Sequence, residues 1–69
     1  MPLPMAPVGE ALTVKKILVD ERDRRHLADL GIVTGAQVEL ISAAGGSVIL
    51  RVKDGRLAID RALALKILV

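Results

Sequence analysis

The chain has 69 residues, which leaves room for one domain with one hydrophobic core. It contains no cysteine, which excludes disulfides and thiolate metal sites, and no aromatic residue, which excludes the stacking surfaces that bind single-stranded nucleic acids or proline-rich peptides. Ten basic and eight acidic residues give a net charge of only +2, and no apolar run approaches the roughly 20 residues of a membrane span. We therefore expect one soluble domain over residues 1–69, located in the cytoplasm, with no signal peptide and no affinity for nucleic acid.

The first predicted elements are a strand and a short helix. Apolar residues from Leu12 to Val19 alternate with a shift of phase at 15–16, which predicts a strand with a β-bulge. Residues 20–30 change to a mixture of acids and bases, which predicts a helix with Asp20 as its N-cap. Gly31 is expected to end this helix in the left-handed backbone conformation.

The remaining segments predict short strands and turns. Asp60 is expected to cap a single helical turn that runs through Ala64. The turns are expected at 43–46 and at 53–56, where Asp-Gly indicates a tight hairpin. The strands are expected at 38–41, 48–52, 57–59 and 65–69. The fold class that follows is all-β with one short helix, a small, strongly bent β-barrel of five to six strands.

His26, the only histidine, lies in the predicted helix close to acidic residues. With Asp23 or Asp29 three residues away it would supply too few ligands for a tight transition-metal site. We therefore interpret His26 as a surface residue beside solvated acids, and expect no cofactor and at most a weak divalent-metal contact.

Catalysis is not indicated by any motif. No base accompanies the hydroxyls of Thr34, Ser42 or Ser47, and the glycines at 45–46 lack the helix and the Lys-Ser/Thr of a phosphate loop. We expect that the protein is not an enzyme and that it works by binding a partner.

Two groups of side chains are candidates for that binding. The bases Arg51, Lys53 and Arg56 surround one hairpin, where solvated charges that protect a sheet edge are the favoured interpretation and phosphate contacts the alternative. The second group is apolar and surrounds the helix end, at Leu27, Leu30, Ile32 and Val33. A chain this small with 52% hydrophobic residues cannot bury all of them, so we expect part of the second group to form an exposed patch, with Ile32 as the first choice and Leu30 as the second. Core packing is the alternative for each.

Three segments of the sequence resemble the FeoA family. They are residues 4–10, Pro-Met-Ala-Pro-Val-Gly-Glu; residues 25–36, with Leu-x-x-Leu-Gly-Ile-x-x-Gly from Leu27 to Gly35; and residues 52–64. The likeness covers nearly the whole chain. Thr34 departs from the family, which usually has proline before this glycine.

The resemblance implies an SH3-like barrel that takes part in bacterial ferrous iron uptake, a transition-metal transport process. Such a protein binds the cytosolic part of FeoB, a membrane transporter with a GTP-binding domain, and assists or regulates it. It is then peripheral to the membrane through that partner. The resemblance is compatible with a monomer and with a homo-oligomer. Carried onto this chain, the family's contact region corresponds to Leu27, Leu30, Gly31 and Ile32.

Two alternatives remain. A similar SH3-like domain ends the metal-dependent repressors, where a helix-turn-helix domain precedes it, so the chain could be a stand-alone module that binds a proline-rich or metal-loaded partner. Residues 1–69 contain no helix-turn-helix pattern, which favours the transport accessory. A small barrel associated with RNA or ribosomes is disfavoured by the missing aromatic residues and the low charge.

Overall fold

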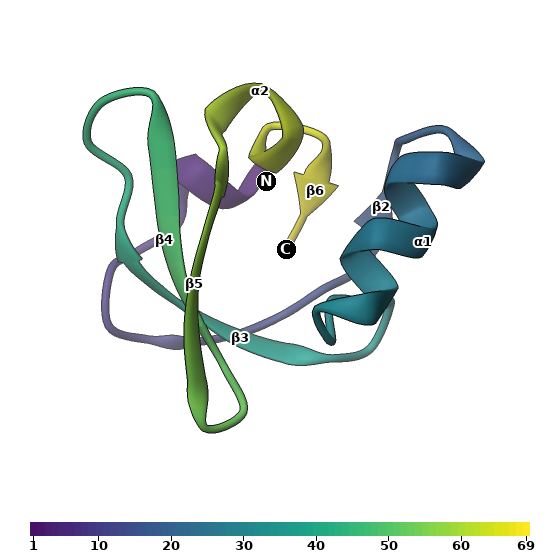
Figure 1. The fold of residues 1–69 in the computed structure, drawn as a ribbon. Helices are drawn as coiled ribbons and strands as arrows, with labels where there is room; N and C mark the ends of the chain where they lie inside the picture. The colour runs from purple at the N-terminus through teal and green to yellow at the C-terminus, as the bar shows by residue number, and fades with distance from the viewer.

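Six strands and three short helical segments make up the structure, a computed structural model that describes all residues from 1 to 69 (Figure 1). The helical segments are η1 (Leu3–Met5), α1 (Glu21–Asp29) and α2 (Arg61–Ala64). The strands are β1 (Ala11–Thr13), β2 (Lys16–Ile17), β3 (Gln37–Ser42), β4 (Ser47–Val52), β5 (Gly55–Asp60) and β6 (Ile67–Leu68). No helix is both long enough and apolar enough to cross a membrane.

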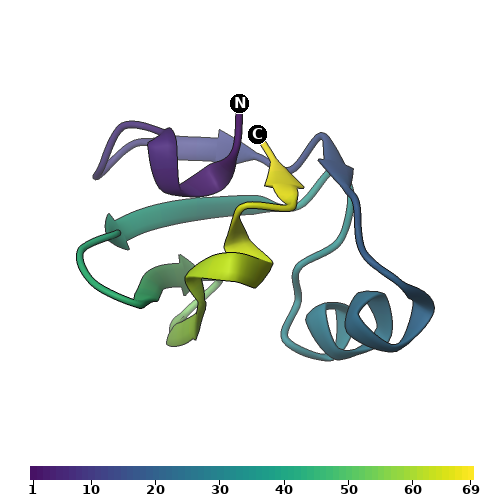
Figure 2. The same ribbon diagram turned by 90° about the horizontal axis from the view of Figure 1, so that it is seen from above.

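The strands form two antiparallel sheets. The larger has the order β1-β3-β4-β5, and the smaller consists of β2 and β6. Figure 2 shows the larger sheet from above, with α2 and β6 beside it and α1 projecting to one side. The predicted all-β class with one principal helix is confirmed, and the six strands enclose the core as two sheets that hydrogen bonds do not close into one barrel.

The strand predicted from Leu12 to Val19 is instead two strands in different sheets. Thr13 pairs with Gln37 in the larger sheet, whereas Lys16 pairs with Leu68 in the smaller one. Val14 and Ile17 are both buried although they are three positions apart, so the alternation of buried and exposed residues breaks where the chain changes sheets. The β-bulge expected at Lys15–Lys16 is therefore wrong, and the register irregularity that does occur lies in β3, between Leu40 and Ser42.

Both ends of α1 follow from local chemistry. The Asp20 carboxylate accepts a hydrogen bond from the backbone N–H of Asp23 at 2.9 Å, which confirms the N-cap. At the other end Gly31 has φ +89°. Its N–H donates to the carbonyl of Ala28 at 2.9 Å, and the N–H of Ile32 donates to that of Leu27 at 2.8 Å. This pair of bonds is a Schellman motif, which confirms Gly31 as the residue that ends the helix.

Two smaller expectations need correction. Asp60 occupies the N-cap position of α2, but its side chain makes no capping hydrogen bond. In the second hairpin Val52 pairs with Gly55, so the loop residues are Lys53 and Asp54, one position earlier than the predicted Asp-Gly turn. Lys53 therefore takes the left-handed conformation, with φ 55°, and Gly55 begins β5.

The core consists of 14 buried hydrophobic residues drawn from nearly every element. Alternation places every second residue of β4 inside, as expected for a strand with one buried face. The members are Leu3, Ala6, Val14, Ile17, Leu27, Ile32, Val38, Leu40, Val48, Leu50, Val52, Ile59, Ala64 and Ile67. No buried polar side-chain atom lacks a hydrogen-bond partner.

The two ends of the chain lie side by side (Figures 1 and 2). Pro2 forms an isolated antiparallel bridge with Leu68. The N–H of Val69 donates to the carbonyl of Met1 at 2.8 Å, and the amino group of Met1 donates to the carbonyl of Val69 at 2.8 Å. Leu68 thus pairs both with Lys16 of β2 and with Pro2, and the bonds between Met1 and Val69 continue the second of these pairings.

Candidate functional site

The four residues predicted to contact a partner differ in exposure. Leu27 is 0% and Ile32 is 1% exposed, and both belong to the core, whereas Leu30 and Gly31 are half-buried. The exposure predicted for Ile32 is therefore wrong. The Schellman motif explains the difference: the residue after the helix-ending glycine commonly packs toward the position that its N–H binds, here Leu27, and both side chains belong to the core.

Val33, the next residue, is the exposed apolar side chain of this segment. Its side chain is 45% exposed, and it stands directly after the buried Ile32. The sequence placed Val33 in the apolar group around the helix end but could not rank it above Ile32. The direction of each side chain depends on the path of the loop after Gly31, which α1 and the sheet jointly determine.

A shallow groove of about 330 Å³ lies between α1 and the segment that follows it. Its four apolar residues come from β2, α1 and the loop after Gly31: Ile17, Ala28, Ile32 and Val33. Its polar lining consists of Glu21, Arg24, Arg25 and Thr34. The Arg24 Nη2 donates to the carbonyl of Ile17 at 3.0 Å, which fastens α1 to β2 across the groove. Ile17 and Ala28 could not be recognised from the sequence as groove residues, because only the tertiary fold brings β2 against α1.

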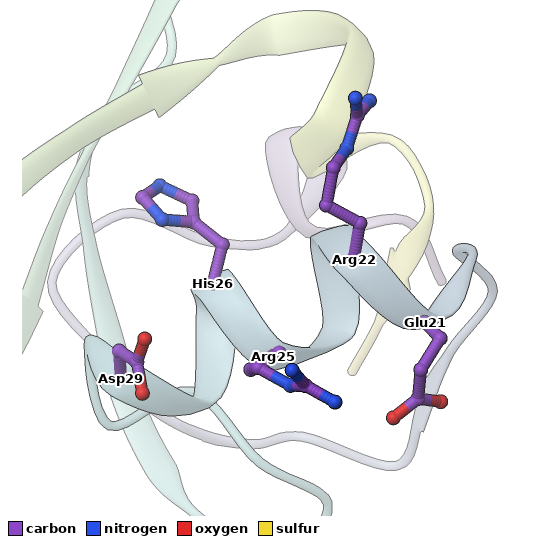
Figure 3. A pocket seen from close by; sticks show the side chains of 5 residues that line it. All are labelled: Glu21, Arg22, Arg25, His26 and Asp29. Carbon is purple, nitrogen blue, oxygen red and sulfur yellow. The ribbon is translucent and has the colours of Figure 1, made fainter.

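The exposed face of α1 carries a second depression, lined only by charged and polar side chains (Figure 3). Glu21 and Asp29 lie at the two ends of the helix, and Arg22 and His26 extend from the same side of it. All of these side chains come from one helix and spread along it without converging. No three histidine, aspartate or glutamate side chains of the chain come together to hold a metal ion. The side chain of His26 is exposed at the surface.

The three bases of the β4–β5 hairpin have different surroundings. The Arg51 Nε lies 3.9 Å from Glu39 Oε1, so this arginine is paired across β3 and β4. Lys53 is at the turn and Arg56 is exposed on β5, directly opposite Arg51. Arg51 and Lys53 border a shallow depression of about 220 Å³ on the sheet, which Glu39 also lines, whereas Arg56 lies outside it.

Comparisons with known proteins find similar proteins that match this chain over nearly its whole length. The family model described as the FeoA domain matches residues 1–69. A Methanocaldococcus jannaschii protein named Fe(2+) transport protein A is 38% identical over 68 residues, which cover 99% of this chain and 83% of that protein. A crystal structure of an iron uptake regulatory protein, FeoA, has a TM-score of 0.87 at 28% identity and covers 97% of this chain and 91% of its own.

A manganese-dependent transcriptional repressor shares the fold. Its TM-score is 0.84 at 18% identity, and the match covers 97% of this chain but 39% of the repressor. At this identity the likeness concerns the SH3-like fold alone.

Proposed function

Because the chain belongs to the FeoA family, which is associated with ferrous iron transport, we propose that it is an accessory protein that binds the cytosolic part of the FeoB ferrous iron transporter and assists or regulates it. It acts in the cytoplasm, has no catalytic site of its own, and reaches the membrane only through this partner. The observation that carries the proposal is the match to the family over all 69 residues.

The groove beside α1 is the contact surface in this proposal. It has an apolar floor in which Val33 is the exposed large apolar residue, and two arginines, Arg24 and Arg25, line its border. Such a groove fits one apolar side chain of a partner, flanked by acidic groups that pair with the arginines. Leu30 and Gly31 contribute from the end of α1, and the buried Leu27 and Ile32 act by holding the loop that carries Val33.

Calorimetry with the purified chain and the cytosolic GTP-binding domain of FeoB from the same organism tests the proposal. We expect Val33→Glu to weaken binding by at least about 2 kcal/mol, or roughly thirtyfold, because it places a charge in an apolar contact. Leu65→Glu is the matched control: Leu65 is 44% exposed, against 45% for Val33, and it does not line the groove. Thermal melting should show that both variants stay folded.

The experiment tests the proposed partner and the proposed contact surface separately. If the unaltered chain does not bind the cytosolic part of FeoB, the proposed function is wrong. If it binds and Val33→Glu binds equally well, the partner is right and the groove is not the contact surface.

A further inference from the structure

β5 is an open edge of the larger sheet. It has six residues, whereas the opposite edge strand, β1, has three. Because Val52 and Gly55 flank a two-residue loop, they form a hydrogen-bonded pair, and such pairs recur at every second residue of the hairpin. The intervening residues of β5 therefore direct their backbone N–H and C=O groups away from β4: Arg56, Ala58 and Asp60, all of which are exposed.

The charges on this edge have no partners within the chain. Arg56 faces Arg51, a like charge that is itself paired with Glu39. Asp60 faces Ser47, forms no ion pair, and leaves its carboxylate unused at the start of α2. Like charges directly opposite each other destabilise a strand pair, so Arg56 lacks the acid that would offset Arg51.

We propose that two copies of this chain associate through β5, antiparallel, about a two-fold axis at Ala58. In that register Arg56 of each copy lies opposite Asp60 of the other, and the half-buried Leu57 lies opposite Ile59 of the second copy. Two ion pairs form at once because a two-fold interface repeats every contact. The outward backbone groups of Arg56 and Ala58 and the N–H of Asp60 pair as well, whereas the Asp60 carbonyl, at the N-cap of α2, stays with the first turn of that helix. The two four-stranded sheets join into one sheet of eight strands.

A second copy fits this edge better than a foreign strand because the edge is self-complementary. The segment from Arg56 to Asp60 carries a base at one end and an acid at the other, with the small Ala58 at its centre. An antiparallel copy brings the opposite charges together without any change in the fold. Unlike most protected edges, β5 has neither a proline nor a bulge that would prevent pairing.

Sedimentation velocity of the full chain over a concentration series tests the proposal. We expect a monomer–dimer equilibrium that Arg56→Asp and Asp60→Arg each weaken at least about tenfold, because each variant replaces two attractive cross-strand pairs by two repulsive ones. Arg22→Asp has the same charge change as the first variant but lies on the exposed face of α1, and we expect it to dimerise normally.

Mixing the two charge variants gives the sharper result. One strand then carries two acids and the other two bases, so the mixture should form a heterodimer although neither variant associates alone. Ala58→Pro removes an outward N–H without removing a bond to β4, and it should abolish association in a chain that still melts cooperatively.

Three results would overturn the inference. They are a chain that stays monomeric over the whole series, dimerisation that the charge variants leave unchanged, and a mixture that does not associate. The test is independent of FeoB and of the groove beside α1.

Discussion

Replacing Gly31 by alanine should destabilise the domain for two separable reasons. At φ +89° a residue with a Cβ is strained, at a cost of about 1–2 kcal/mol. A Cβ at this position would also lie 3.1 Å from Cγ1 of Val52, a core residue that is 6% exposed and cannot easily move. Together we expect a loss of about 2–3 kcal/mol, and for a domain of this size each kcal/mol lowers the melting temperature by about 4–8 °C.

Gly35→Ala is the control that isolates the contact with Val52. Gly35 has φ +91°, yet a Cβ built there meets nothing within 4 Å. Both variants therefore carry a similar backbone strain, and only Gly31→Ala carries the contact. Urea denaturation of the two variants, of Val52→Ala and of the double variant Gly31→Ala/Val52→Ala gives the coupling energy directly.

Equal losses for the two glycine variants, with no coupling to Val52, would refute the contact. A Gly31→Ala midpoint within error of the parent would refute the left-handed conformation itself. Gly31→Val should be worse than Gly31→Ala, since a β-branched side chain adds atoms beside Val52.

Three further predictions concern single residues. Ile32→Glu should unfold the domain, as seen by circular dichroism, because it buries an unpaired charge at a position that is 1% exposed; a folded variant would contradict the placement of Ile32 in the core. Calorimetric titration with Fe²⁺ should reveal no tight site, and His26→Ala should change nothing, whereas a sub-micromolar site that this variant removes would show that His26 is a ligand. Lys53→Gly should raise the free energy of unfolding by about 0.5–1 kcal/mol, because glycine accepts the left-handed conformation of this turn without strain; an unchanged or lower denaturation midpoint would count against that conformation.

Local chemistry made part of the fold predictable. The carboxylate of Asp20 caps the helix three residues before the N–H that it binds, and Gly31 ends the helix with a conformation that other residues avoid. Both features depend on residues next to each other in the chain. The burial pattern of β4 is equally local, since successive residues of a strand point alternately to the core and to the other face of the sheet.

Features that depend on distant segments were not predictable in the same way. The chain leaves one sheet for another at Val14 because β6, about fifty residues later, offers a second partner to Lys16. The groove arises from the contact of β2 with α1, so Ile17 could not be recognised from its neighbours in the sequence. Ile32 is a different case, because the local Schellman motif, in which the residue after Gly31 commonly packs toward Leu27, was the signal that could have placed it in the core.

The pairing of the chain ends affects how the protein forms during translation. β2 pairs only with β6, and Pro2 bridges to Leu68, so residues near the start cannot complete their pairing until residues 67–68 have been synthesised and have left the ribosome. The β3–β4–β5 segments are contiguous hairpins that can form earlier, because they close short loops. Until β6 has emerged, η1 and β2 remain without part of their packing, and Leu3 and Ile17, buried in the finished domain, stay exposed.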